Sequence, residues 1–148
     1  MGGYYDRGSF GRTVRQDNQP EDRVRIEVVQ AGANPATLKE KKGLPPIPIE
    51  RTRDTGLLHK DGAISMARLG PDTATHAFFI CVGDQPELDF GGSRNADGQG
   101  FAAFGRVVRG GDVARKILSA PADGQALRPS ITIAGATRLE DSPVSVRD

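Results

Sequence analysis

Alternating hydrophobic and polar positions predict several short strands along this 148-residue chain. In residues 23–30 (RVRIEVVQ), Val24, Ile26 and Val28 would share one face while charged side chains occupy the other, which is typical of a half-buried strand. A continuous apolar run at residues 77–82 (AFFICV) is the strongest strand signal. Shorter runs complete the set of expected strands, at residues 63–67, 101–108 and 130–134.

One helix is expected over residues 110–119, with Asp112 as its N-cap and Val113, Ile117 and Leu118 on one face. The segments between these elements are rich in turn-forming and polar residues, and we expect loops there. These segments are residues 12–22, 31–43 (a loop or a poor short helix) and 91–100.

The composition fits short strands joined by loops. The 19 glycines and 10 prolines require many turns, and 36% hydrophobic residues provide for one core in one domain. Three prolines in residues 44–49 exclude the middle of a sheet and favour an extended loop, with a proline-motif ligand as the alternative. Four or five strands and one helix place the chain in the mainly β class.

Charge and hydropathy narrow the classes of partner. The 20 basic and 19 acidic residues nearly cancel, so we expect neither nucleic acid nor a membrane surface as a partner. The sequence has no run of 18 apolar residues, so we expect no membrane-spanning helix, and the chain as written shows no signal peptide. Cys81 is the only cysteine, which excludes an internal disulfide.

The metal-binding residue types do not cluster in the sequence. His59 and His76 are too isolated for a metal site or for a triad with Cys81. A loose calcium loop could be imagined in residues 89–97, but its acidic positions lack regular ligand spacing and a closing glutamate. A turn-rich surface loop is therefore favoured, and no metal or cofactor is expected.

Two adjacent phenylalanines, Phe78 and Phe79, stand in the strongest predicted strand. Because successive strand side chains point to opposite faces, one of them fills the core and the other lines a second apolar surface. That surface is either a helix-packing site or a ligand pocket, and periodicity does not assign either phenylalanine to either role.

Six short motifs, taken in order, resemble those of cyclophilin-type peptidyl-prolyl cis-trans isomerases of the bacterial type. They are FGR at 10–12, VVQAG at 28–32, SMA at 65–67, GPDT at 70–73, FFIC at 78–81 and FAAFGRVVRG at 101–110. The resemblance covers residues 3–139, with an enlarged loop between Arg12 and Gln30. It implies an eight-stranded closed antiparallel β-barrel with two capping helices. It also implies an isomerase that assists protein folding without a cofactor, acting on proline-containing peptides and on unfolded or folding proteins.

The resemblance implies a role for seven residues. Arg12 matches the catalytic arginine, whose guanidinium would stabilise the twisted amide. An apolar pocket for the proline ring would consist of Val28, Phe79, Leu88 and Phe101, so Phe79 would be the pocket residue and Phe78 the core residue. Gln30 and the main chain of Ala67 would bind the substrate backbone. Without this context, Arg12 reads as a surface arginine, and Val28 and Leu88 read as core packing.

Several positions depart from the family pattern. Phe101 replaces a pocket histidine, Glu87 a tryptophan and Ala77 a glutamine; Glu27, Ala31 and Gly11 also differ. Ala77 has no side-chain amide to anchor a substrate. We therefore expect reduced activity, and the alternative function is a peptide-binding module with little or no catalysis.

The start of the chain also departs from the family pattern. In the family, a segment like residues 3–6 follows a β-hairpin and the first capping helix, so we expect a domain over residues 1–139 that is incomplete at its N-terminus. The favoured explanation is a true start upstream; the others are completion by a partner through open sheet edges and a degenerate fragment. The location is cytoplasmic as written, or periplasmic or secreted if a signal peptide lies upstream of Met1. Residues 140–148 are expected to form a flexible tail.

Overall fold

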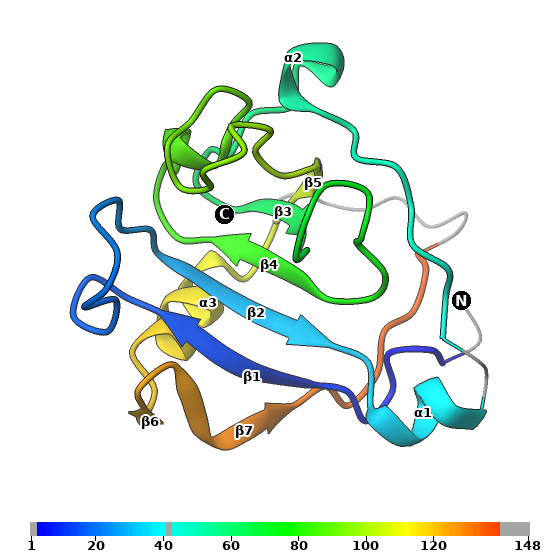
Figure 1. Cartoon of the computed structure of the whole chain (residues 1–148). Helices are drawn as coiled ribbons and strands as arrows, with labels where there is room; N and C mark the ends of the chain where they lie inside the picture. Colours follow the sequence, from blue (N-terminus) through cyan, green and yellow to red (C-terminus); the bar gives the residue numbers. More distant parts are fainter. Residues whose placement is uncertain (1–2, 41–42, 140–148) are drawn as a thin grey trace.

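One antiparallel sheet is the framework of the computed structural model, which describes residues 3–40 and 43–139 (Figure 1). Within these residues the sheet has seven strands in the order β5-β3-β4-β2-β1-β7-β6. Their bounds are β1 (Ser9–Val14), β2 (Val28–Gly32), β3 (Ala63–Met66), β4 (Phe78–Cys81), β5 (Ala103–Arg106), β6 (Ala122–Asp123) and β7 (Ala126–Thr132). The described residues contain no strand pairing between β5 and β6 or β7, so hydrogen bonds do not close the sheet. The expected mainly β class is confirmed.

Short helices connect the strands, and one of them covers a face of the sheet. They are α1 (Pro35–Glu40), α2 (Thr52–Thr55), the 3-10 helix η1 (Pro86–Leu88) and α3 (Gly111–Leu118). In Figure 1, α3 lies behind β1 and β2, and it contacts both strands. Its buried Ile117 packs against Val29 of β2 and Leu127 of β7, which anchors the helix to the sheet.

The two faces of the sheet carry separate apolar clusters, because neighbouring strand residues point to opposite sides. We call the first the pocket-face cluster: Val14, Ile26, Val28, Ala63, Phe79, Cys81 and Leu88, with Ala67 and Phe101 packed against it. The helix-face cluster is Val29, Ile117 and Leu127, with partly buried neighbours that include Phe10 and Ile80. The predicted opposition of Phe78 and Phe79 holds, since Phe79 is in the pocket-face cluster while Phe78 packs edge-on against Tyr5 and Phe10. The prediction that Phe78 is the core residue is wrong, because Phe79 is the buried one of the two and Phe78 is only partly buried.

A β-bulge in β1 turns Arg12 toward the pocket face. Phe10 pairs with Ala31 and Arg12 pairs with Gln30, so Gly11 is one extra residue in β1. In a regular strand Phe10 and Arg12 would point the same way. The bulge reverses the alternation, and Phe10 joins the helix-face cluster while Val14, two residues after Arg12, joins the pocket-face cluster.

The predicted strand at residues 23–30 is wrong in its first half, because β2 begins at Val28. Side chains bind the backbone of Val24 and Ile26 in place of a neighbouring strand. Gln19 accepts from the Ile26 N–H (3.1 Å) and donates to the Ile26 carbonyl (2.8 Å), and Arg94 donates to the Val24 carbonyl (2.7 Å). These bonds satisfy the backbone groups that a strand ladder would otherwise pair.

Three further expectations are corrected. Residues 12–14 were expected in a loop but belong to β1, which is held between β2 and β7. The N-cap of α3 is Gly110, in the left-handed region at φ 91°, and not Asp112, which lies in the first turn. Val113 is half exposed and does not share the buried face of Ile117. The predicted tail at residues 140–148 lies outside the described residues.

Candidate active site

A pocket of about 430 Å³ opens on the pocket face of the sheet. Its lining includes all seven residues to which the sequence analysis gave a role: Arg12, Val28, Gln30, Ala67, Phe79, Leu88 and Phe101. Residues far apart in the sequence thus surround one cavity, with a guanidinium and an amide beside aromatic and aliphatic side chains.

The strand register sets the polar and apolar residues in one row across the sheet. Arg12 of β1 pairs with Gln30 of β2, which pairs with Phe79 of β4, which in turn pairs with Ser65 of β3. Directly opposite residues in antiparallel strands project from the same face. The row therefore runs from a cationic donor to an aromatic ring within three strands.

The Arg12 guanidinium is held at two nitrogens. Nη1 donates to Gln30 Oε1 (3.0 Å), and Nε donates to Gln125 Oε1 (2.8 Å). In the part of the chain that the structure describes, Nη2 has no hydrogen-bond partner. Partial burial lowers the pKa of Arg12, the Arg94 charge adds to this effect and Asp22 opposes it. An arginine stays protonated at neutral pH even so, which keeps Nη2 a donor.

Four apolar side chains form the other part of the pocket. Phe79, Leu88 and Val28 are almost fully buried, at 4%, 0% and 3% exposure, so only small parts of them reach the cavity. Phe101 is partly buried and packs edge-on against Phe79, with ring centroids 5.3 Å apart. An apolar wall of this kind suits a small aliphatic ring.

A buried polar chain lies beneath Phe79. The His59 ring stacks on the Phe79 ring, with centroids 6.0 Å apart. Its Nδ1 lies 2.7 Å from Asp89 Oδ1 and its Nε2 lies 2.8 Å from Ser65 Oγ. A carboxylate only accepts, so Nδ1 carries the proton and Nε2 accepts from Ser65. Burial lowers the pKa of His59, and the hydrogen bond and charge of Asp89 oppose the shift.

Cys81 offers no nucleophile to this region. Burial, with the charges of Asp89, Asp61 and Asp84, raises the pKa of its thiol to about 12. The thiol is therefore protonated at neutral pH. Within the described ranges no three metal-binding side chains converge.

Arg68 fastens the loop at residues 91–100 to the pocket. Its guanidinium pairs with Asp97 (3.1 Å), donates to the Gly100 carbonyl and lies 4.8 Å from the centre of the Phe101 ring. The hydrogen bond from Arg68 holds the pKa of Asp97 below its usual value, and the Gln99 N–H adds to this. Asp97 is thus engaged by a cation, while Asp89 is engaged by His59.

Sequence reasoning missed several contributors to the site, among them Arg68, Ile26, Arg94 and Gln125. Ile26 and Arg94 line the pocket, and Gln125 holds Arg12. The apolar alternation at residues 24–28 was a signal for Ile26. No local pattern signals Gln125 or Arg94, because each acts through contacts more than 70 positions away.

The positions that depart from the family pattern fall in different places. Ala77 lines the pocket and contributes no side-chain donor. Glu87 is not part of this lining, and its carboxylate accepts from the Ser93 N–H (2.7 Å). The departures therefore change the pocket mainly at Ala77 and Phe101.

Comparison with known proteins agrees with this geometry. Residues 1–138 match the family model described as cyclophilin type peptidyl-prolyl cis-trans isomerase/CLD, and the chain belongs to this family. It is 44% identical over 91 residues to peptidyl-prolyl cis-trans isomerase A of Dickeya dadantii, covering 61% of this chain and 45% of the relative. It is 34% identical over 112 residues to peptidyl-prolyl cis-trans isomerase cyp18 of Streptomyces antibioticus, covering 75% and 60%. The chain spans about half of the length of the curated relatives that it matches.

A solved structure supports the fold assignment. A cyclophilin type peptidyl-prolyl cis-trans isomerase of Cryptosporidium parvum, determined in the presence of the dipeptide Ala-Pro, superposes with a TM-score of 0.64. The match covers 89% of this chain and 74% of that one at 20% identity. The antiparallel sheet is therefore a cyclophilin-like one.

Within residues 3–40 and 43–139, no helix is both long and apolar enough to cross a membrane.

Proposed function

We propose that this chain is a peptidyl-prolyl cis-trans isomerase that accelerates rotation about Xaa-Pro peptide bonds and so assists protein folding. The observation that carries the proposal is the Arg12 guanidinium beside the apolar wall of Val28, Phe79, Leu88 and Phe101. Gln125 and Gln30 hold its Nε and Nη1, and among the described residues its Nη2 has no hydrogen-bond partner.

The chemistry of the reaction fits these residues. Rotation about an amide bond has a barrier of about 18–20 kcal/mol, because it breaks resonance. In the twisted amide the proline nitrogen regains its lone pair and can accept a hydrogen bond. A positioned guanidinium that donates to this nitrogen stabilises the twisted state more than the planar one, which is the requirement for catalysis. No bond is broken, so the reaction needs neither a nucleophile nor a metal.

The substrate class follows from the same pocket. The proline ring sits against Phe79, Leu88 and Phe101, while Gln30 and the main chain of Ala67 bind the neighbouring peptide backbone. Proline-containing peptides and unfolded or folding proteins are the substrates. The Cryptosporidium isomerase was crystallised in the presence of an Ala-Pro dipeptide, which supports this class.

Ala77 favours a second candidate, a peptide-binding module with little or no catalysis. It lines the pocket without a side-chain amide, so one anchor for the substrate backbone is missing. Peptide affinity without rate enhancement in the wild-type chain would support this candidate over the isomerase.

Substitution of Arg12 tests the isomerase. Arg12→Ala should lower kcat/KM for an Xaa-Pro peptide by about 10²–10³-fold, the cost of removing one preorganised donor. The matched control is Arg23→Ala, which removes an arginine outside the pocket and should leave kcat/KM unchanged. Equal rates for Arg12→Ala and wild type would reject Arg12 as the catalytic residue.

We also propose that the chain associates with itself through the open edge of β5. This strand pairs only with β3 among the described residues, and Phe104 on it is 51% exposed. An unpaired edge with an exposed aromatic residue is a site for strand pairing between copies. Sedimentation velocity should show association that rises with concentration and is weaker in Phe104→Lys. A monomer at all concentrations would refute the proposed self-association.

A further inference from the structure

Gln125 is the second anchor of the Arg12 guanidinium, and it comes from the opposite side to Gln30. It lies in the turn between β6 and β7, directly before Ala126, which pairs with Arg12. Its Oε1 accepts from Arg12 Nε at 2.8 Å, across 113 positions of sequence. The two glutamines therefore hold Nε and Nη1 from the β6–β7 turn and from β2. Among the described residues Nη2 has no partner, so it remains for a substrate.

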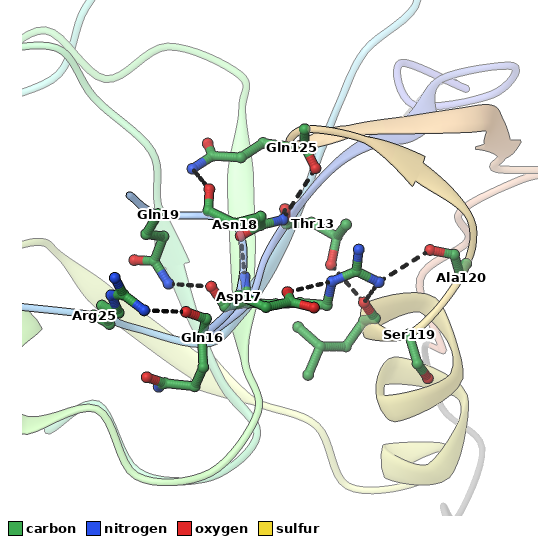
Figure 2. Close-up of polar contacts among 12 residues, drawn as sticks. Thr13, Gln16, Asp17, Asn18, Gln19, Arg25, Ser119, Ala120 and Gln125 are labelled. Atoms are coloured by element: carbon green, nitrogen blue, oxygen red, sulfur yellow. Dashed lines mark hydrogen bonds and ion pairs between the residues drawn. The ribbon is translucent and has the colours of Figure 1, made fainter. Parts of the chain in front are cut away.

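The orientation of the Gln125 amide is itself fixed. Its Nε2 donates to the Asn18 carbonyl (3.1 Å; Figure 2), which leaves its oxygen to accept from Arg12. Asn18 is in turn held on three sides. Its Nδ2 donates to the carbonyls of Thr13 (2.9 Å) and Gly124 (3.1 Å), and its Oδ1 accepts from the Arg15 N–H (2.7 Å). The loop after β1 thus aligns the amide that aligns the arginine.

The side chain of Gln125 adds to a hairpin that is already held by its backbone. The Thr13 N–H donates to the Gln125 carbonyl (2.9 Å), and β6 pairs with β7 at two positions. These bonds do not involve the side chain at position 125. The amide of Gln125 is therefore not required to close the turn, whereas its bond to Arg12 exists only through the side chain.

We propose that Gln125 is a positioning residue that sets the plane of the Arg12 guanidinium and so directs Nη2 toward the proline nitrogen. This inference rests on the proposed isomerase function. With Gln30 alone, the guanidinium is held at one nitrogen and can turn about that contact. A misplacement of about 1 Å at a reacting group can cost up to about a hundredfold in rate. Gln125 acts on the rate through Arg12 and is not part of the apolar wall.

The test compares Gln125→Met, which keeps the length of the side chain without its hydrogen bonds, with wild type. Turnover and peptide affinity are obtained separately from NMR line shapes of an Xaa-Pro peptide. We expect kcat to fall roughly tenfold while peptide affinity changes less than about twofold, because the apolar wall is intact. Gln125→Glu keeps an acceptor for Arg12 and should recover kcat to within about threefold of wild type.

The matched control is Gln99→Met. Gln99 Oε1 also accepts from an arginine Nε, that of Arg51, outside the pocket. This variant should lower kcat much less than Gln125→Met does, because the side-chain contact that it removes lies outside the pocket. If it lowers kcat as much as Gln125→Met does, the effect is a general loss of packing and the inference is overturned.

The exchange rate of the Arg12 Nε–H with water reports the contact between Arg12 and Gln125 without an activity measurement. In wild type the Arg12 Nε–H resonance should be slow to exchange with water, and in Gln125→Met it should exchange fast. A fast-exchanging Nε–H in wild type overturns the inference even if Gln125→Met does not fold. Equal kcat in wild type and Gln125→Met overturns only the role of Gln125. No catalysis by the folded wild type overturns the proposed function, and this inference with it.

Discussion

Phe79 serves both the core and the candidate site. It is 4% exposed within the pocket-face cluster, its ring stacks on His59, and its edge contacts Phe101. A single side chain thus forms part of the pocket wall and holds the sheet to the polar chain beneath it. Under the proposed function, stability and peptide binding are therefore expected to be coupled at this position.

Phe79→Ala should lower the free energy of unfolding by about 3–5 kcal/mol, the usual cost of emptying a buried phenylalanine site. Urea denaturation measures the change. Phe104→Ala is the control, because Phe104 is half exposed on β5, and it should cost less than about 1 kcal/mol. Similar losses in the two variants would show that Phe79 is not a core residue.

Stability should decrease in mild acid because of His59. Burial lowers the pKa of His59 in the folded chain, so below the unfolded pKa of about 6.5 the unfolded chain binds more protons. The contribution of His59 to the free energy of unfolding is therefore fully present above about pH 6.5. It is lost as the pH falls toward the folded pKa. Urea denaturation at several pH values between about 7.5 and 5.5 should show a free energy of unfolding that falls with pH. The fall should be smaller in His59→Gln. Identical slopes would mean that His59 titrates alike in both states.

At the scale of elements, the bulge in β1 brings the site together. It allows Phe10 to pack toward α3 and Arg12 to reach the pocket. Gly11 supplies the extra residue, yet its φ lies outside the left-handed region and a Cβ there would meet no atom within 4 Å. The bulge therefore does not depend on glycine.

Gly11→Ala should raise the free energy of unfolding by about 0.4–1 kcal/mol, because alanine restricts the unfolded chain. Gly56→Ala is the contrasting control. Its Cβ would also meet nothing, but its φ of 75° is left-handed, so it should cost about 1–2 kcal/mol. The urea denaturation midpoints of the two variants, compared with that of wild type, test these expectations. Destabilisation by both would show that the bulge requires glycine.

The sequence was informative where an element is apolar and locally patterned. Apolar runs located β3 and β4, and the opposition of Phe78 and Phe79 followed from strand geometry alone. β1 was missed because its bulge and its polar Arg12 and Thr13 hide the alternation, and because its support comes from β2 and β7. The resemblance named seven residues that the structure gathers around one pocket. Gln125 could not be found, since only the register of β7 against β1 brings it to Arg12.

At the scale of the whole molecule, the sheet separates two tasks. One face packs on α3, which lies behind β1 and β2 in Figure 1. The other face carries the pocket, which is lined by residues of the sheet, of η1 and of the loop at residues 91–100. Arg12 lies where β1, β2 and β7 meet, so its position depends on the sheet and on the C-terminal hairpin together. The sheet thus supports a pocket that loops complete.

The most direct test of the account is NMR exchange spectroscopy on an Xaa-Pro peptide with this 148-residue chain added. The amide spectrum of the chain is recorded in the same sample. Uncatalysed exchange takes tens to hundreds of seconds, so cross-peaks between cis and trans forms at mixing times of about one second require catalysis. The account predicts such cross-peaks with wild type and their loss with Arg12→Ala at unchanged amide dispersion. Dispersed wild-type amides without exchange cross-peaks would contradict it.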